Sequence, residues 1–130
     1  YNTGMGIYGV GKTYGPLLIA EIGNVSRFTH REALTAFAGV DPGVDESGQH
    51  KSKSNRASKV GSARLRKTLF QIMTTLLQNA PEDDPVYRFL DKKRAQGKPY
   101  YVYMTAGANK FLRIYYGKVK ECLRNLEQAE

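Results

Sequence analysis

Ser47 is the side chain whose surroundings best suit nucleophilic chemistry. It stands in a Glu-Ser-Gly turn, directly ahead of a strongly basic stretch. A serine hydroxyl is a poor nucleophile until a base, a metal ion or fixed cations activate it. Phosphoryl transfer depends mainly on charge neutralisation. A flexible serine followed by many cations therefore suits attack on a nucleic-acid phosphate, although most Ser-Gly pairs are simple turns.

The basic stretch leads into the clearest helix of the sequence. No acidic residue occurs between Glu46 and Glu82, and the cations of this stretch are Lys51, Lys53, Arg56, Lys59, Arg64, Arg66 and Lys67. Cations at a helix N-terminus oppose the macrodipole by ~0.3–1 kcal/mol each. A docked anion would remove this conflict, because backbone N–H groups and arginines would converge on it. We therefore predict phosphate binding here, with side chains extended into water as the alternative.

A second candidate phosphate contact lies near the first residues. Four glycines within residues 4–11 predict a hairpin, and an apolar helix follows as far as Gly23. This order resembles the second half of a helix-hairpin-helix motif, in which backbone N–H groups hold a DNA phosphate. The expected contacts are Gly9, Gly11 and Lys12, and a plain tight turn is the alternative.

Other reactive side chains are weaker candidates. His50 could act as a base or phosphate donor, but a loop histidine is more often solvated. His30 is expected at the start of a helix. Tyr115 and Tyr116 could indicate a tyrosine nucleophile, but they fit an apolar stripe and an interface position better. Two histidines and one cysteine, widely spaced, predict no metal site.

The elements that must position these residues are helices, and no segment has the pattern of a strand. The expected helices are 13–22, 30–38 ended by Gly39, 62–79 capped by Ser62, 85–96 closed by Gly97, and a last one beginning after Pro99 that Gly107 and Gly117 could bend. Residues 40–60 lack helical periodicity and predict a long basic loop. The predicted fold is a small all-α domain with a helix-hairpin-helix-like N-terminal part.

The apolar stripe of the last helix holds most of the remaining aromatic and sulfur side chains. Cys122 fits this stripe and is expected to be a buried small hydrophobe. Tyr100, Tyr101 and Tyr103 could stack on bases, but packing against other helices is the preferred interpretation.

Composition limits the class of protein and of partner. The chain has 130 residues, a length that favours one domain over residues 1–130. Its net charge of +8 favours polyanionic partners. The single cysteine fits a reducing, cytosolic compartment, and no apolar run is long enough to span a membrane. Because there is neither an initial methionine nor a signal pattern, we expect a piece of a longer protein.

The order of several short motifs resembles the C-terminal transposase domain of IS110-family transposases, which are bridge-RNA-guided recombinases. The matching pieces are Gly9-Val10-Gly11, Ala20-Glu21-Ile22-Gly23, Arg27-Phe28, residues 36–42, Ser47-Gly48, Lys59-Val60-Gly61, residues 64–69 and residues 110–113. No single piece is specific, but the ordered set covers nearly the whole chain.

This resemblance implies a DNA recombinase that uses Ser47 as its nucleophile. It also implies a guide RNA, assembly into a homo-oligomer, and a bacterial cytoplasmic location at the nucleoid. In addition it implies a RuvC-like domain, outside residues 1–130, whose carboxylates bind Mg²⁺. Without that domain, this chain is expected to bind nucleic acid but not to cleave it. Two alternatives are a non-catalytic helical domain that contacts backbone phosphates, and a helical interaction module whose charge only aids solubility.

Overall fold

The computed structural model describes residues 11–41 and 51–129, and side chains are described for residues 14–41 and 62–128. Five α-helices and one short 3₁₀ helix account for most of this part of the chain. They are α2 (Gly11–Ile22), η1 (Val25–Arg27), α3 (Arg31–Ala38), α4 (Lys51–Asn79), α5 (Pro85–Ala95) and α6 (Tyr100–Ala129). No strand occurs in the described ranges, and the predicted all-α class is confirmed.

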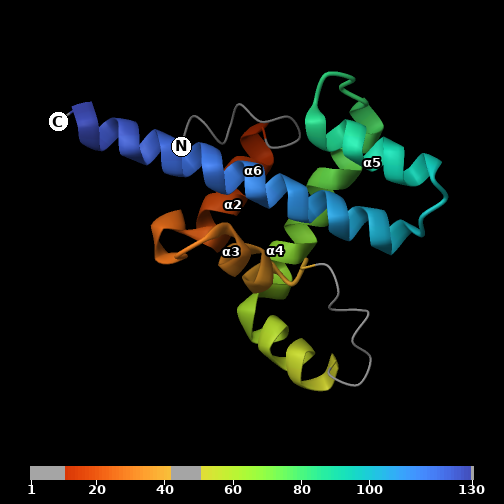
Figure 1. Cartoon of the computed structure of the whole chain (residues 1–130), viewed down its shortest axis with the longest axis horizontal. Helices are drawn as coiled ribbons and strands as arrows, with labels where there is room; N and C mark the ends of the chain where they lie inside the picture. Colours follow the sequence, from red (N-terminus) through yellow and green to blue (C-terminus); the bar gives the residue numbers. More distant parts are fainter. Residues whose placement is uncertain (1–10, 42–50, 130) are drawn as a thin grey trace.

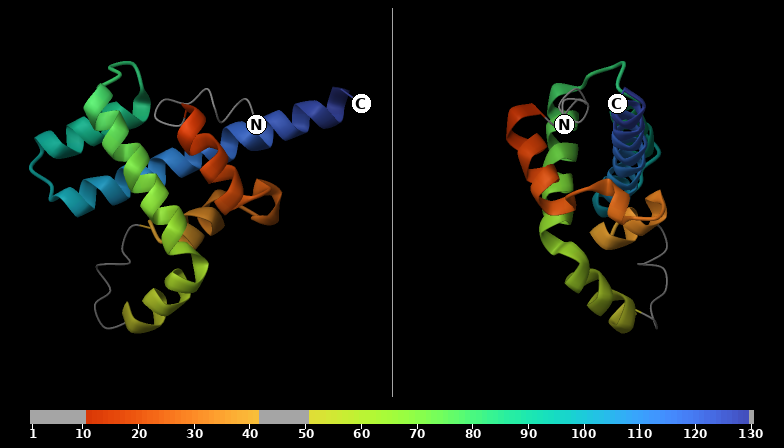
Figure 2. Two further views of the ribbon diagram at one scale, coloured as in Figure 1. Left: turned by 180° about the vertical axis from the view of Figure 1, so that it is seen from behind. Right: turned by 90° about the vertical axis from the view of Figure 1, so that its left-hand side faces the viewer.

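The two longest helices, α4 and α6, cross one another, and the shorter helices pack around the crossing (Figure 1). Figure 2 shows α2 beside α4 in one layer, whereas α3 packs against both α4 and α6. Helix α5 returns antiparallel along the first half of α6, and the last turns of α6 extend beyond the other helices. None of the described helices combines the length and hydropathy needed to span a bilayer.

The core is formed by the apolar faces that the spacing of residues predicts. Helix α4 buries Leu65, Leu69, Ile72, Met73 and Leu76, and α6 buries Met104, Ala108, Phe111, Leu112, Tyr115 and Val119. These residues recur every three or four positions, so each helix presents one continuous stripe to its neighbours. The stripe of α6 fades toward the C-terminus: Cys122 is only half-buried, contrary to expectation, and Leu126 is exposed.

The predicted helix boundaries follow from local chemistry. His30 caps α3, because its Nδ1 accepts a hydrogen bond from the backbone N–H of Ala33, and Gly39 ends α3 in the left-handed conformation. The Asp84 carboxylate caps α5 at the backbone N–H groups of Val86 and Tyr87. Gly97 ends the turn after α5 with a φ of 82°.

Gly107 does not bend α6, which is continuous through it and through Gly117. The absence of a side chain at residue 107 instead allows close packing of three helices. A Cβ at this position would lie 2.4 Å from Leu90 Cδ2 on α5 and 3.2 Å from Met73 Sδ on α4. At Gly117, by contrast, a Cβ would meet nothing within 4 Å.

The prediction of a loop over residues 40–60 is wrong from Lys51 onward, because α4 begins there. The segment 51–61 contains no proline and several good helix formers, but it lacks an apolar stripe. Because a polar helix has no apolar face, the spacing of apolar residues could not reveal that this segment is helical. The helix is interrupted only at Ser62, whose backbone is extended, with φ −179° and ψ 95°.

Candidate nucleic-acid interface

The predicted nucleophile and part of the glycine hairpin lie outside the described residues. Ser47, His50 and Gly9 all fall in segments 1–10 and 42–50. Their roles, and the helix-hairpin-helix-like arrangement of the first residues, stay predictions. Gly11 and Lys12 are described by their backbone alone, which forms the first turn of α2. This helix therefore begins two residues before residue 13, at which it was expected to begin.

The seven predicted phosphate-binding cations after Ser47 all belong to α4. Lys51, Lys53, Arg56 and Lys59 are placed on its first part by their backbone, and their side chains lie outside the described residues. Arg64, Arg66 and Lys67 follow the interruption at Ser62, and their side chains are described. The basic stretch is thus helical rather than a loop, with one change of direction within it.

Ser62 acts as the predicted cap of the second part of α4. Its Oγ accepts a hydrogen bond of 2.8 Å from the backbone N–H of Leu65. The extended backbone of Ser62 is the conformation expected of an N-cap residue. This cap satisfies one of the free N–H groups at the start of the core-forming segment 63–79.

Glu21, at the end of α2, supplies an anion to this helix start. Its Oε2 lies 3.6 Å from Nη1 of Arg64, and its Oε1 accepts a 3.5 Å hydrogen bond from Oγ of Ser62. A carboxylate near a helix N-terminus complements the macrodipole. Neither the predicted phosphate nor the alternative of side chains extended into water included a protein anion, and Glu21 supplies one for Arg64. Glu21 belongs to the Ala20-Glu21-Ile22-Gly23 motif, but no sequence pattern indicated that it contacts Ser62, 41 positions later.

Arg64 keeps most of its surface available despite this ion pair. Its side chain is 83% exposed, whereas that of Glu21 is 19% exposed. Pairs with such an exposed member are weak, ~0.2–1 kcal/mol, because water competes for the charges. Arg66 is half-buried and Lys67 is exposed, and neither forms an ion pair with a described carboxylate. These three cations can therefore still receive an external anion.

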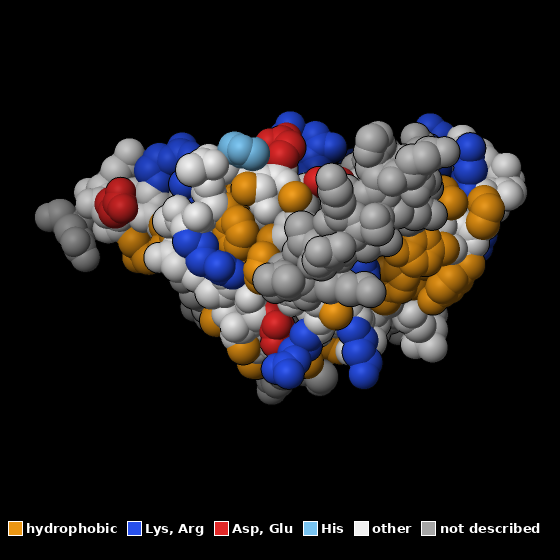
Figure 3. All heavy atoms as spheres, turned by 90° about the horizontal axis from the view of Figure 1, so that it is seen from below, with side chains coloured by type: hydrophobic (Ala, Val, Ile, Leu, Met, Phe, Trp, Pro, Cys, Tyr) orange, Lys and Arg blue, Asp and Glu red, His pale blue; other side chains and the backbone are white. Residues whose placement is uncertain are grey.

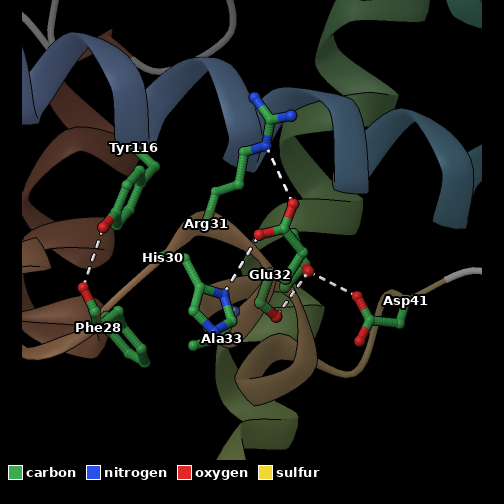
Figure 4. A network of polar contacts seen from close by, with 8 residues as sticks. Phe28, His30, Arg31, Glu32, Ala33, Asp41 and Tyr116 are labelled. Atoms are coloured by element: carbon green, nitrogen blue, oxygen red, sulfur yellow. Dashed lines mark hydrogen bonds and ion pairs between the residues drawn. The ribbon is translucent and has the colours of Figure 1, made fainter.

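The chain that leads from α3 toward residues 42–50 is held by two contacts. Asn109 on α6 donates a buried hydrogen bond of 3.2 Å from Nδ2 to the carbonyl oxygen of Val40. The Thr35 hydroxyl lies 2.5 Å from Oδ1 of Asp41 (Figure 4). A cavity of about 170 Å³ beside them is lined by Glu32, Thr35, Asp41, Asn109 and Arg113. Sequence patterns did not identify Thr35 or Asn109 as positioning residues.

Glu32 lies at the edge of this cavity and also contacts the start of its own helix. Figure 4 shows its carboxylate between His30 and Arg31, with oxygen–nitrogen distances of 3.2 Å to each. A hydrogen bond from its own backbone N–H, followed by one from Arg31, lowers the pKa of Glu32 below its ordinary value of 4.5. The carboxylate is therefore ionised at neutral pH.

Arg27 and Tyr116 have structural contacts that their motifs did not indicate. Arg27 Nε donates a 2.8 Å hydrogen bond to the carbonyl of Ile22 at the end of α2, and its guanidinium lies over the rings of Phe28 and Phe37. The Tyr116 hydroxyl donates to the Phe28 carbonyl at 3.0 Å. Tyr116 therefore joins α6 to the segment before α3. Since Tyr115 is 2% exposed, neither tyrosine presents a free nucleophile.

The described acidic, histidine and cysteine residues do not gather in groups of three or more that could hold a metal ion. The expectation that Tyr100, Tyr101 and Tyr103 pack against other helices is confirmed in part. Tyr103 packs against the core, and the ring centroid of Tyr101 lies 5.8 Å from that of Phe70 on α4, whereas Tyr100 is 57% exposed. Figure 3 shows one face of the molecule, on which Lys and Arg side chains outnumber acidic ones.

Residues 4–88 match the model of a family described as "Transposase IS116/IS110/IS902 family". The matched part extends from the first glycines through α2, α3 and α4 and into α5. No curated protein and no solved structure matches the chain.

Proposed function

Because the chain belongs to the IS116/IS110/IS902 family of transposases, we propose that it binds nucleic acid along α4 and supplies Ser47 as the nucleophile for DNA cleavage and strand exchange. The general function, that of a transposase domain, rests on the family match. The role of Ser47 follows from the resemblance of its Ser-Gly pair to the family, and the role of α4 from its cations and their position after Ser47.

The observation that carries the proposal is that the basic stretch forms a helix immediately after the predicted nucleophile. Lys51, the first residue of α4, follows Ser47 by four positions. Four residues span at most roughly 14 Å when fully extended. A phosphate held by cations on the first turns of α4 would therefore lie within reach of the Ser47 hydroxyl.

The described cations support phosphate binding at the second part of α4. Arg64 is largely exposed, Lys67 is exposed, and Arg66 has no described acidic partner. Guanidinium groups bind phosphate oxygens in pairs, and several cations together neutralise the charge that develops during phosphoryl transfer. Gly9, Gly11 and Lys12 are proposed as additional backbone and side-chain contacts before and within the first turn of α2.

In the proposed reaction, Ser47 Oγ bonds to the phosphorus of a DNA phosphodiester. The bond from phosphorus to one sugar oxygen breaks, the hydroxyl proton is lost, and the departing sugar oxygen takes up a proton. The serine–phosphate ester retains the energy of the broken linkage. A sugar hydroxyl of another strand can then attack this ester, which restores Ser47 and joins the exchanged strand.

The described residues do not provide a Mg²⁺ site, so we place the metal in a RuvC-like domain outside residues 1–130. A guide RNA and a homo-oligomeric assembly complete the proposed recombinase. In this arrangement the present chain alone binds nucleic acid without cleaving it. The bound metal would add charge neutralisation at the phosphate that Ser47 attacks.

A Ser47→Ala variant of the full-length transposase tests this assignment. Retained DNA affinity with complete loss of strand exchange is expected, because only the nucleophile is removed. Ser52→Ala is the matched control, since it removes a hydroxyl from the same basic stretch and should leave exchange unchanged. Normal recombination by Ser47→Ala would overturn the nucleophile and leave a non-catalytic binding domain as the function.

A further inference from the structure

A second cation-rich region is the hairpin formed by α5 and the first half of α6. Between Pro85 and Arg113 the sequence holds seven lysines and arginines against one acidic residue. This excess of six is three quarters of the net charge of +8 of the entire chain. Within residues 82–98, three of the four acidic residues lie in the turn before α5 and at its cap, apart from the cations that follow.

Two cations of this hairpin converge on one aromatic ring. The ammonium nitrogens of Lys93 on α5 and Lys110 on α6 each lie 5.4 Å from the ring centroid of Phe89. All three side chains are half-buried, whereas Lys92 and Arg113 nearby are exposed. One cation from each helix therefore contacts the same ring.

The charge of this pair is not balanced within the described part of the chain. Asp91, the single acidic residue of α5, lies 2.9 Å from Arg94 and pairs with it. Neither Lys93 nor Lys110 forms an ion pair with a described carboxylate. Attraction of each ammonium to the ring is weak and leaves its charge unneutralised. A bound anion would neutralise the charge of both lysines.

We propose that Lys93 and Lys110, held by Phe89, form a second contact for the sugar–phosphate backbone of nucleic acid, separate from the predicted contact on α4. This proposal extends the nucleic-acid binding proposed above and depends on it. A polyanion fits because the same hairpin carries further exposed cations, among them Lys92 and Arg113, which a small isolated anion would leave unpaired. DNA and RNA offer the same phosphate chemistry, so both are tested.

The test measures affinity of the full chain for a DNA duplex and for an RNA strand of matched length across a series of salt concentrations. Lys93→Gln with Lys110→Gln should weaken binding and lower the salt slope by about two, one for each lost phosphate contact. The control, Lys118→Gln with Arg124→Gln, removes the same charge from exposed positions of α6 and should change the slope much less. The nucleic acid with the larger slope change is the one that occupies this site.

A charge-neutral variant separates geometry from net charge. Phe89→Leu keeps both lysines but removes the ring, so we expect weaker binding with an unchanged fold by circular dichroism. If the Lys93/Lys110 double variant and its control lose equal affinity, or if Phe89→Leu binds normally, the second contact is overturned. The variant Arg66→Gln with Lys67→Gln reports on α4 independently, so failure of this inference and failure of the proposed function give different results.

Discussion

Glu21 and Arg64 form an ion pair of 3.6 Å that joins the end of α2 to the first turn after the interruption of α4. The carboxylate also accepts a hydrogen bond from Ser62, the cap of that turn. The helix start at which we propose phosphate binding therefore already contacts one protein anion. Arg64, the partner of Glu21, is largely exposed, so a phosphate can approach the guanidinium without breaking a buried contact.

Glu21→Gln should strengthen nucleic-acid binding and slightly weaken folding. The substitution removes a negative charge beside the proposed phosphate contact, so the phosphate is repelled less. It also removes the ion pair with Arg64 and a favourable charge at the helix start, each of which contributes ~0.3–1 kcal/mol to folding stability. Affinity at fixed salt and urea unfolding measure the two effects. Arg64→Gln is the paired variant and should weaken binding. Equal or reduced affinity for Glu21→Gln would argue against a phosphate at this helix start.

Ser62→Ala should destabilise the chain by ~1 kcal/mol, because the backbone N–H of Leu65 loses its cap. Urea unfolding followed by circular dichroism measures this change. Ser62→Thr is the control, since threonine also caps helices and keeps the hydroxyl that donates to Glu21, so it should retain most of the stability. A destabilisation by Thr as large as that by Ala would show that the cap is not the reason.

Gly107→Ala and Gly117→Ala should change stability in opposite directions. At residue 107 a Cβ would clash with Leu90 and crowd Met73, and overpacking of a core typically costs ~1–3 kcal/mol. At residue 117 there is open space, so alanine should stabilise the helix by roughly 0.5–1 kcal/mol. Thermal unfolding of both variants checks this. Two stabilised variants would mean that α5 and α6 pack less closely at Gly107 than described.

Glu32 should make folding depend on acid pH. Its pKa is lowered in the folded chain by the hydrogen bond from its own backbone N–H and by Arg31. A lowered pKa means that the contribution to stability is complete above the unfolded value near 4.5 and disappears as pH falls through the folded value. The stability difference between wild type and Glu32→Gln should therefore shrink below pH 4.5. A difference independent of pH would exclude this carboxylate as its source.

The parts of the fold that were predictable are those encoded within a few residues. His30 and Gly39 bound α3, Ser62 caps the core segment of α4, and Gly97 closes α5 as expected, because capping depends on local backbone and side-chain chemistry. The helical segment 51–61 was not predictable from periodicity, since its polar residues show no apolar face.

The contacts that organise the candidate site were beyond sequence patterns for a different reason. Asn109 and Val40 are 69 positions apart, and Tyr116 and Phe28 are 88 apart. Such pairs meet only because α6 lies across the end of α3, which depends on the packing of the whole core. The convergence of Lys93 and Lys110 likewise requires the α5–α6 hairpin and has no local signature.

If Ser47 is the nucleophile, a DNA phosphate becomes covalently attached to it during recombination. This attachment can be detected by incubating the full-length transposase with its DNA and guide, stopping the reaction in denaturant, digesting it and identifying nucleotide-bearing peptides by mass spectrometry. We expect a phosphodiester-linked nucleotide on Ser47 and none in Ser47→Ala. A nucleotide adduct at any other residue, or strand exchange that proceeds without an adduct on Ser47, would contradict this role of Ser47.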